Sequence, residues 1–544
     1  MAERTQINRR HLLQASAAGV SLLAMTDGAP QLARAKPPGK STLPNILIFV
    51  TDQDRGVQNF PRNWERDNLP GITRLKKHGL TFANAFTNSC MCTPARVTWL
   101  TGYFPAQHGA KYTLEEDMPA PAYPQGEMPL PPLPDSLEAT LPNLATVMTA
   151  AGYNVVYKGK WHCSKPAFGD TFIPEDLLQY GFSRWNPPDG GANQDVSEGG
   201  GAPDRPDNHD DRYMYADGDS EAGEEGVLAF LASEASRQQP FCLIVSLVNP
   251  HDVLSYPNNY AAFGYTNEWL NGRIQLPLTL DEDLKRKPAV QGQLLRLLNG
   301  MGVLNTREKK LAYVNFYGNL MKHSDGYLVE VLDALKKTNL LNDTVIIRTA
   351  DHGEMGLSHG GMRQKNFNFY EESIRVPLVF SNPKMFPGGE STQALVSHVD
   401  FLPTMAALVG APLAARSAWQ GVDYSSILLH SPSRPVQDYI AFTYDDFQAG
   451  QNSGPYAGEG SDFLGPAVPN RIISLREDRY KLAQYYDPTG VLTPEFEMYD
   501  LLTDPKEQRN LAYKDYRRTP EQERQFARLR DKLAVIAVTR LLPL

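Results

Sequence analysis

Four runs of apolar residues stand out along the chain, and polar residues follow each of them directly. The runs cover residues 45–50, 153–157, 241–248 and 344–349. Continuous apolar runs of this length are typical of buried strands in a parallel sheet. Ligands bind beyond the carboxyl ends of such strands, so we expect the polar residues that follow the four runs to form a site there.

Helix-like segments lie between these runs and complete the pattern of the first part of the chain. Residues 141–151 and 311–337 are examples, and the segment that begins at His398 is predicted to be a last core helix. Strands that alternate with helices predict an α/β fold, in which helices cover both faces of one sheet.

The pattern changes in the last quarter of the chain. Short strands are predicted at 472–475, 480–485 and 497–499, and a helix is predicted from about Pro520 onward. These elements suit a smaller C-terminal α+β domain with an antiparallel sheet. We therefore expect a large catalytic domain over residues 36–430 and a C-terminal subdomain over residues 431–544.

The first 35 residues have the features of an export signal. Adjacent arginines at positions 9 and 10 precede a short, Ala-rich apolar stretch, and Ala33-Arg34-Ala35 offers a cleavage site. This predicts a twin-arginine signal peptide over residues 1–35, the twin-arginine translocase as a partner, and a periplasmic or secreted location. The apolar stretch is too short for a membrane span, so no stable membrane anchor is expected.

Charge and cysteine content narrow the class of protein further. The 544 residues carry a formal net charge of −9 without a long basic run, which argues against a nucleic-acid partner. The four cysteines at positions 90, 92, 163 and 242 lack the density and spacing of a disulfide framework. We expect no structural disulfide network.

Two of these cysteines lie in the stretch CMCTPARVTWLTG, residues 90–102, where a helix is predicted to begin. Thr93 suits the N-cap, Pro94 suits the first helical position, and Gly102 suits the stop. Cys92 would then lie beside the positive end of the helix dipole, with Arg96 one turn further on. This placement predicts a thiol with a depressed pKa and unusual reactivity.

Candidate metal ligands follow two of the predicted strands. Asp52 with Gln53 and Asp351 with His352 could converge on one cation from distant parts of the chain. The oxygen-rich set favours Ca²⁺, and His352 keeps Mn²⁺ or Mg²⁺ open. A single Asp at a strand end is more often a cap or turn former, but the repetition favours a ligand set.

Four basic side chains are predicted to surround that cation: Lys160, His162, His251 and Lys365. Singly, such residues are surface charges or core histidines. Together, at the strand ends and loops of one sheet, they would hold a tetrahedral oxyanion, and a histidine would protonate the departing oxygen. The residues by themselves therefore predict ester hydrolysis at a tetrahedral anion.

Two long loops, residues 114–134 and 187–225, follow the predicted nucleophile helix and a strand end. Both are biased in composition, and they are either solvated surface or walls of the pocket. Their acidic residues would repel a polyanion, which favours a small substrate. These residues are Glu115, Glu116, Asp117, Asp204, Asp207, Asp210 and Asp211.

The segment from Cys92 to Gly102 resembles the sulfatase signature C-x-P-x-R with its downstream T-G. The resemblance extends to NILIFVTDQ, GKWH, NPH, ADHGE, KNFNFYEESIRVP and MYDLLTDPKEQRNL, in that order along the chain. It spans nearly all of the chain after the signal segment. The resemblance implies an alkaline-phosphatase-like mixed sheet with helices on both faces and a smaller C-terminal domain.

The resemblance also implies roles for individual residues. Cys92 matches the cysteine that a maturation enzyme converts to formylglycine, whose hydrate is the nucleophile, and Arg96 matches the arginine that helps to activate it. Asp52, Gln53, Asp351 and His352 match the metal ligands, together with modified Cys92. Lys160 and Lys365 match the sulfate-contacting lysines. His162 matches the histidine that assists the hydrate, and His251 matches the one that faces the leaving group.

Two positions depart from the common sulfatase pattern. Many sulfatases have Asp where this chain has Gln53, and Asn where it has His352. The departures resemble choline-sulfatase-like and phosphonate-monoesterase-like branches. We expect hydrolysis of a small aryl or alkyl sulfate ester. The alternatives are a phosphonate monoester or phosphodiester hydrolase on the same scaffold, and an exported, non-catalytic binding protein that contains a metal.

Overall fold

The computed structural model of the chain describes eleven stretches of residues, and the account below concerns these alone. They are 43–57, 59–114, 142–166, 171–191, 196–203, 205, 208–217, 224–411, 419–430, 435–445 and 467–542. The signal peptide predicted over residues 1–35 lies outside them. So do five of the acidic loop residues, namely Glu115, Glu116, Asp117, Asp204 and Asp207.

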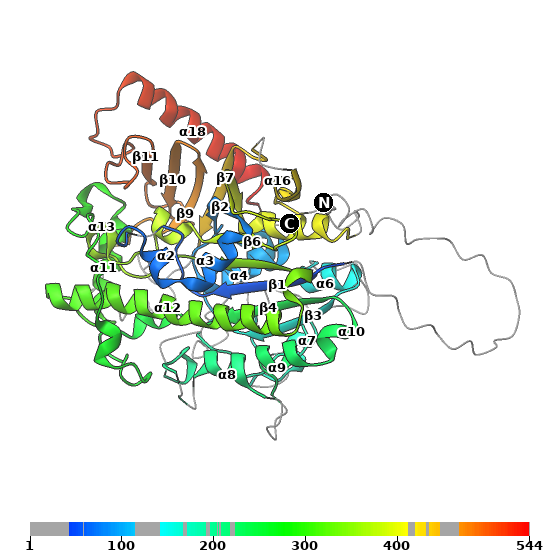
Figure 1. Ribbon diagram of the computed structural model, residues 1–544. Coiled ribbons are helices and arrows are strands. Elements are labelled where there is room, and N and C mark those ends of the chain that lie inside the picture. The colour runs from blue at the N-terminus through cyan, green and yellow to red at the C-terminus, as the bar shows by residue number, and fades with distance from the viewer. Residues whose placement is uncertain are drawn as a thin grey trace, which may run out of the picture.

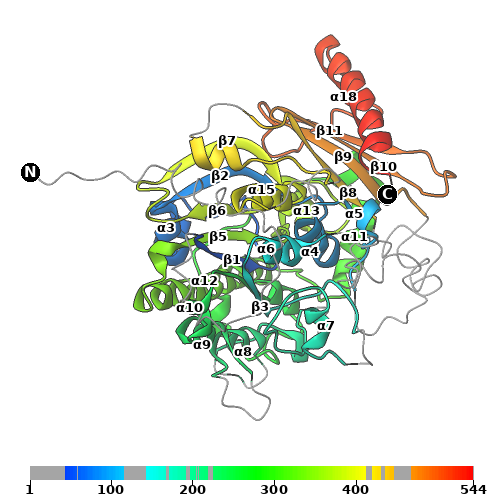
Figure 2. The ribbon, with the colours of Figure 1, turned by 90° about the vertical axis from the view of Figure 1, so that its right-hand side faces the viewer.

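A seven-stranded mixed sheet forms the centre of the molecule, in the order β3-β4-β1-β5-β6-β2-β7 (Figure 2). Its strands are β1 Asn45–Thr51, β2 Gly79–Phe86, β3 Asn154–Gly159, β4 Phe241–Leu247, β5 Thr344–Ala350, β6 Leu378–Ser381 and β7 Glu390–Ser397. Strands β3, β4, β1 and β5 pair in parallel, with Val50 beside Ser246 and Thr349. The four predicted strands are therefore confirmed, and their carboxyl ends share one edge.

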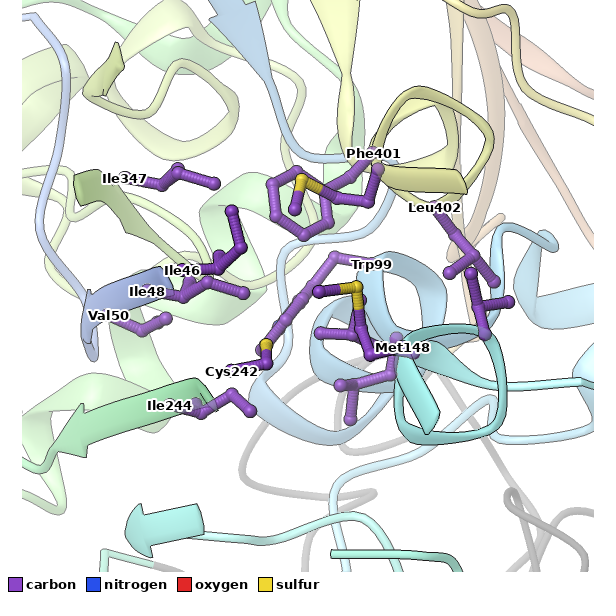
Figure 3. Close-up of a cluster of buried hydrophobic side chains, with 14 of the residues drawn as sticks. Ile46, Ile48, Val50, Trp99, Met148, Cys242, Ile244, Ile347, Phe401 and Leu402 are labelled. Carbon is purple, nitrogen blue, oxygen red and sulfur yellow. The ribbon is translucent and has the colours of Figure 1, made fainter. Parts of the chain in front are cut away.

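Side chains of β1 alternate between two apolar layers, as the period of a strand requires. Ile46, Ile48 and Val50 face one layer with Trp99 and residues of helices α4 Cys92–Thr101, α6 Leu144–Ala150 and α15 Phe401–Leu408. Figure 3 shows these strand side chains beside Trp99, Met148 and Phe401. Both predicted helices that fall here, at 141–151 and after His398, are confirmed.

The opposite layer contains Leu47 and Phe49 of β1 with residues of helices α3 Pro70–Lys77, α9 Val227–Ala232 and α12 Arg307–Lys337. Helix α12 runs along the sheet in Figure 1. It begins four residues before the predicted start at 311, because the side chain of Thr306 accepts a hydrogen bond from the backbone N–H of Lys309 and caps the first turn.

A second sheet, with the order β11-β10-β9-β8, forms the C-terminal part. Its antiparallel strands are β8 Tyr439–Tyr444, β9 Arg471–Glu477, β10 Tyr480–Tyr486 and β11 Glu495–Asp500, and helix α18 Pro520–Thr539 covers it (Figure 1). Leu529 and Leu533 of the helix pack on Leu482 and Met498. The three predicted strands and the terminal helix are confirmed, and β8 is an additional strand.

Shorter helices connect these elements. The α-helices are α2 Trp64–Asn68, α5 Pro105–His108, α7 Glu175–Leu178, α8 His209–Tyr215, α10 Ala235–Gln238, α11 Ala289–Asn299, α13 Ser358–Gly361, α14 Glu371–Ile374 and α16 Ser425–His430. The 3₁₀ turns are η2 Val196–Glu198, η3 His251–Ser255, η4 Asn267–Leu270, η5 Leu284–Arg286, η6 Leu341–Asp343 and η7 His398–Asp400. Among the described helices, none combines the length and the apolar character needed to cross a membrane.

Candidate active site

The carboxyl edge of the central sheet brings the predicted polar residues together. The backbone N–H of Asp52 donates to Leu247 O at 3.2 Å, and that of Asp351 donates to Thr51 O at 3.4 Å. These bonds extend the pairing of β1 with β4 and β5 by one step beyond the strands. Both carboxylates are therefore held by the sheet itself, side by side and fully buried.

Helix α4 presents Cys92 to these carboxylates. The helix begins at Cys92, with Met91 as N-cap and Gly102 as C-cap at φ 72°. The predicted N-cap, Thr93, is therefore wrong by two positions, because its hydroxyl accepts a hydrogen bond from the backbone N–H of Leu114 at 3.1 Å instead. Cys92 lies on the first turn of the helix, and the predicted stop at Gly102 is confirmed.

The Cys92 thiol lies against two candidate metal ligands. Its Sγ is 3.2 Å from His352 Nε2 and 3.7 Å from Asp52 Oδ1. Burial and the charge of Asp52 raise the pKa of this thiol to about 11, although Lys160 and Lys365 act in the opposite direction. The predicted depression of the pKa is therefore wrong: the sequence showed the helix start but neither the depth of the site nor the carboxylates beside it.

Arg96, one turn along α4, is fully buried and joins the two carboxylates. Its Nε donates to Asp351 Oδ2 at 3.0 Å and its Nη2 donates to Asp52 Oδ2 at 3.2 Å. Its Nη1 donates to Ser246 Oγ at 2.8 Å. Burial alone would lower the pKa of Arg96, but Asp351 and Asp52 hold it well above its ordinary value. The guanidinium is therefore a fixed positive charge beneath Cys92.

Four side chains form a group that suits a metal ion: ligand atoms of Asp52, Cys92, Asp351 and His352 all lie within 4.8 Å of one another. Nδ1 of His352 lies 3.0 Å from the carbonyl oxygen of Gly353, which can only accept a hydrogen bond. Nδ1 therefore carries the proton, and Nε2 turns its lone pair toward Cys92 and Asp52. Two carboxylates and one neutral imidazole fit a divalent cation.

Gln53 lies beside this group in a strained conformation, with φ 66°. Its backbone N–H donates to Asp351 Oδ1 at 3.0 Å. Its side-chain Oε1 accepts from Lys365 Nζ at 2.8 Å, and its Nε2 donates to Glu354 Oε2 at 2.5 Å. The positive charge of Lys365 and the negative charge of Glu354 therefore fix the orientation of the Gln53 side-chain amide. Its role as a metal ligand stays a prediction.

Lys160 reaches the site because a glycine precedes it. Gly159 has φ 118°, and a Cβ there would lie 1.8 Å from Ser246 O, so only glycine allows β3 to approach β4 so closely. Lys160 Nζ lies 2.5 Å from Asp52 Oδ2 and donates to Gly191 O. Asp52 thus meets two cations, and the pKa of its carboxyl is held well below its ordinary value by Lys160, His251 and Arg96 despite the opposing effect of burial.

His162 is held at both its backbone and its ring. Its backbone N–H donates to Asp189 Oδ2 at 2.6 Å, and its Nε2 lies 2.5 Å from Leu114 O. The carbonyl can only accept, so Nε2 carries the proton and Nδ1 carries the lone pair. No hydrogen-bond partner from the described residues meets this buried Nδ1. Burial and Lys160 lower the pKa of His162 well below its ordinary value, so the ring is neutral at pH 7.

His251 and Lys365 complete the predicted set, and both side chains are buried. His251 opens η3 after β4. Burial and Lys160 lower its pKa well below its ordinary value, against the influence of Asp52. The structure therefore brings every predicted site residue to one edge of the sheet, although their individual roles stay predictions.

Three supporting residues were not singled out from the sequence. Glu354 is fully buried and accepts hydrogen bonds from Gln53 and from the hydroxyl of Tyr313, the latter at 2.7 Å. Asp189 binds the backbone of Trp161 and His162, and Ser246 binds Arg96. Glu354 belongs to the ADHGE motif, which was a usable signal. Asp189 lies in a Gly- and Asp-rich loop, and no sequence pattern distinguished this buried aspartate from the exposed acidic residues of the same loop.

The loop of residues 187–225 forms part of the wall around the site where it is described. Asp189 and Asp210 are buried, and Asp210 accepts hydrogen bonds from the backbone N–H groups of Val248 and Asn249 at 2.7 and 2.9 Å. Asp211 accepts a hydrogen bond from the Tyr327 hydroxyl at 2.6 Å. The expectation that Asp210 belongs to an exposed acidic rim is therefore wrong, because its carboxylate caps the end of β4.

Comparisons with known proteins identify the family of the chain. A family model described as Sulfatase matches residues 44–411, and a model described as N-sulphoglucosamine sulphohydrolase, C-terminal, matches residues 359–536. Arylsulfatase K of Canis lupus familiaris is 27% identical over 526 residues, covering 92% of this chain and 85% of its own. Choline-sulfatase of Rhizobium meliloti is 27% identical over 497 residues, covering 86% and 82%.

Solved structures show the same fold. The phosphonate monoester hydrolase of Agrobacterium radiobacter superposes with a TM-score of 0.60 at 21% identity, covering 91% of this chain and 96% of its own. The predicted alkaline-phosphatase-like fold with a smaller C-terminal sheet is therefore confirmed. Because the Sulfatase model matches more than half of the sequence, this chain belongs to the sulfatase family and is a sulfuric ester hydrolase.

Proposed function

We propose that the enzyme hydrolyses a small aryl or alkyl sulfate ester to an alcohol and inorganic sulfate. The observation that carries the proposal is the position of Cys92. Its Sγ lies 3.2 Å from His352 Nε2 and 3.7 Å from Asp52 Oδ1, above the buried guanidinium of Arg96. A nucleophile in this position meets the charges that a sulfuryl group requires.

Two groups that this chain must acquire would supply part of the chemistry. Formylglycine made from Cys92 by a maturation enzyme supplies, as its hydrate, a nucleophilic oxygen and a route for the later release of sulfate. A divalent cation held by Asp52, Gln53, Asp351, His352 and residue 92 supplies positive charge for the sulfate oxygens. Ca²⁺ is our first choice, with Mn²⁺ or Mg²⁺ as alternatives.

The side chains of the site provide the proton transfers and the remaining charge. Neutral His162 has its lone pair on Nδ1, so it accepts a proton there from the attacking group. Arg96 stays charged and balances the carboxylates, while Lys160 and Lys365 contact the sulfate oxygens. His251 donates a proton to the oxygen of the departing alcohol, which leaves as a neutral molecule.

The names of related proteins include one small ester, that of choline-sulfatase, beside sulfatases named for a hexuronate and for ulvan. Choline-sulfatase and arylsulfatase K are each 27% identical to this chain over most of its length. The likeness to a phosphonate monoester hydrolase keeps the phosphonate monoester or phosphodiester alternative open, since monoanionic diesters and sulfate esters present similar charge to the site.

A substrate panel tests the proposal. Protein produced with the maturation enzyme is assayed with 4-nitrophenyl sulfate, choline sulfate, a sulfated oligosaccharide, a phosphonate monoester and a phosphodiester. We expect the highest kcat/KM for one of the two small sulfate esters. A preference for either phosphorus ester would favour the alternative reaction. No turnover by protein that carries the aldehyde would favour the non-catalytic binding protein.

Export is a separate proposal. The adjacent arginines at positions 9 and 10 support transport of the folded chain by the twin-arginine translocase to the periplasm or beyond. Folding before transport would allow the maturation enzyme and the metal ion to act in the cytoplasm. Replacing both arginines with lysine should leave the uncleaved chain in the cytoplasm, which cell fractionation measures.

A further inference from the structure

A second buried cluster of histidine and carboxylates lies where the central sheet region meets the C-terminal sheet. We call it the junction cluster, and it consists of Glu282, His359, Glu372 and Glu507. His359 is in α13 and Glu372 is in α14, whereas Glu507 follows β11 of the second sheet. The relative exposure is 0% for His359, 7% for Glu372 and 1% for Glu507. None of these residues belongs to the active site described above.

Two contacts orient the imidazole of His359. Its Nδ1 lies 2.7 Å from Glu282 Oε2, and its ring stacks on Tyr370 with centroids 3.7 Å apart and planes at 10°. A carboxylate on Nδ1 fixes the proton there and leaves the lone pair on Nε2. This arrangement of carboxylate and histidine is the one that orients histidine ligands in metal sites.

Nε2 of His359 is buried and has no hydrogen bond to any described residue. It faces Glu372 Oε2 at 3.6 Å, which is too long for a hydrogen bond. Two ligands that are each about 2.1 Å from a tetrahedral zinc ion are about 3.4 Å apart, so the observed separation suits a shared ion. Ligand atoms of His359, Glu372 and Glu507 all lie within 4.8 Å of one another.

We propose that His359, Glu372 and Glu507 bind a structural Zn²⁺ ion that links the catalytic part of the chain to its C-terminal sheet. One neutral imidazole and two carboxylates are the whole proposed set here, without the further oxygens that Gln53 and residue 92 would add at the active site, and so small a mixed set suits zinc better than Ca²⁺ or Mg²⁺. Glu507 is already oriented, because its Oε2 accepts a hydrogen bond from the backbone N–H of Glu371 at 2.9 Å.

The charged groups around the cluster are close to balance before an ion binds, so the ligand geometry carries the proposal. Carboxylates of Glu282, Glu371, Glu372 and Glu507 meet Lys287, Lys481 and Arg476, whose nitrogens lie 2.7 to 3.3 Å from carboxylate oxygens. With His359 neutral, Arg375, at 3.7 Å from Glu371, is a fourth cation that balances the four carboxylates, and the charge of Arg55 also acts on Glu372. Lys481 lies 2.7 Å from Glu507 Oε1, so it would share that carboxylate with the ion.

A proton on His359 is the competing explanation. Burial alone would lower the pKa of His359, but Glu282 and Glu372 raise it to about 9. A metal ion would have to displace this proton, so zinc should bind more tightly at pH 8 than at pH 6. The two explanations differ in what occupies the space between His359 and Glu372, which a diffraction experiment detects directly.

The test uses the whole enzyme. Crystals grown with 1 mM ZnCl₂ are measured on both sides of the zinc absorption edge. We expect an anomalous peak between His359 and Glu507, separate from any peak at Asp52. In solution, elemental analysis after dialysis should give one zinc ion fewer per chain for Glu507→Gln than for the unmodified sequence. Glu521→Gln, an exposed carboxylate on α18, is the matched control.

Two results would overturn the proposal. One is the absence of an anomalous peak at the junction in zinc-soaked crystals. The other is an equal zinc content of the unmodified chain and Glu507→Gln, which would show that a proton alone holds the cluster together. The variant His359→Gln should also lose one zinc ion. If it does not fold, the crystal measurement on the unmodified chain still decides the question.

Discussion

The active site and the junction cluster are both buried, and both combine histidine with carboxylates, but their surroundings shift the pKa of the histidine in opposite directions. Burial lowers the pKa of His352 in spite of Asp351 and Asp52. In the junction cluster, Glu282 and Glu372 overcome burial and raise the pKa of His359 to about 9. The same residue types therefore lower the pKa of one buried histidine and raise that of the other, and the proposed zinc ion would have to displace the proton that the junction carboxylates favour.

The cause is the distribution of positive charge. In the active site, Arg96 contacts both aspartates and Lys160 contacts Asp52. These cations offset the carboxylate charge that would otherwise stabilise a protonated His352. In the junction cluster, Glu282 also meets Lys287, but Glu372 has no lysine or arginine within ion-pair distance among the described residues. The comparison shows that the cations paired with the carboxylates, and not the number of carboxylates, determine the direction in which the pKa of a buried histidine shifts.

The two clusters also differ in how the chain supports them. Asp52 and Asp351 extend paired strands of one sheet, which fixes them without help from side chains. The junction residues come from short helices and a loop, and Glu507 belongs to the segment after the second sheet. Loss of an active-site group should therefore change chemistry and lower stability without separating the two sheets, whereas loss of the junction group should weaken the contact between them.

The largest effect is expected for Cys92→Ala. Without the residue that becomes the nucleophile, turnover should fall by about 10⁵-fold or more. In the chain without substitutions, produced with the maturation enzyme, peptide mass spectrometry should find an aldehyde at position 92. Cys90→Ala is the matched control, because Cys90 lies two positions before Cys92, outside the C-x-P-x-R motif, and its Sγ donates a hydrogen bond to Lys365 O at 2.8 Å. It should retain the aldehyde at 92, and a fully active Cys92→Ala variant would contradict the mechanism.

The second prediction separates the metal content of the two clusters. Asp351→Asn removes one candidate ligand and leaves Arg96 with a single carboxylate. We expect activity to fall by about 10³-fold and the folded state to lose about 3 kcal/mol, because a buried ion pair loses one partner. Elemental analysis should show loss of the active-site ion and retention of junction zinc. Unchanged metal content at the active site would disprove the assigned ligand set.

The four parallel strands of the central sheet, three strands of the C-terminal sheet and most of the active site could be predicted from the sequence. Apolar runs that end in polar residues located Asp52, Lys160, His251 and Asp351, because parallel strands force their carboxyl ends together. Strands β2 Gly79–Phe86, β6 Leu378–Ser381 and β7 Glu390–Ser397 were missed, and β6 has only four residues, which carry little periodic signal. The N-cap of α4 was predicted at the wrong residue, because the Thr93 hydroxyl accepts a hydrogen bond from the distant backbone N–H of Leu114 and does not cap the helix.

Other features depend on contacts between distant segments, and no local pattern reveals them. The pKa of Cys92 depends on its depth and on Asp52, so the helix position alone gave the wrong direction. Asp189 supports His162 from a loop of biased composition. The junction cluster combines Glu282, His359 and Glu507 from three separate segments; Glu507 lies in the quoted stretch MYDLLTDPKEQRNL, but nothing in the sequence indicated that it meets Glu282 and His359.

The third prediction concerns the charge state of His251. Its pKa lies well below 6.5, so the protonated fraction is small at pH 7 and falls as the pH rises. If His251 protonates the departing oxygen, kcat/KM for an alkyl sulfate should fall by about tenfold per pH unit above that pKa. His251→Gln should lower kcat/KM by about 10²-fold and remove this slope.

The leaving group provides the control for this prediction. 4-Nitrophenol is a good leaving group and needs little protonation, so the profile for 4-nitrophenyl sulfate should be flatter than that for an alkyl sulfate. Equal slopes for the two esters, or an unchanged slope in His251→Gln, would show that another group donates the proton.

The smallest effect is expected for Glu282→Gln, which leaves all three proposed zinc ligands in place. Glu282 lies 2.7 Å from His359 Nδ1 and would support the ligand without touching the ion. Loss of its charge should weaken zinc binding by about 10 to 100-fold. Because the residue does not contact the active-site group, kcat/KM should stay within about twofold of the unmodified enzyme.

Competition with a fluorescent zinc chelator measures the affinity, and Asp283→Asn is the matched control. Asp283 is the neighbouring acidic residue, and its side chain is 65% exposed. It should bind zinc as tightly as the unmodified chain. If Glu282→Gln kept full zinc affinity, the carboxylate would have no supporting role at His359. If the variant instead lowered kcat/KM by tenfold with zinc bound, the two clusters would be coupled, and the independence inferred from their separate supports would be wrong.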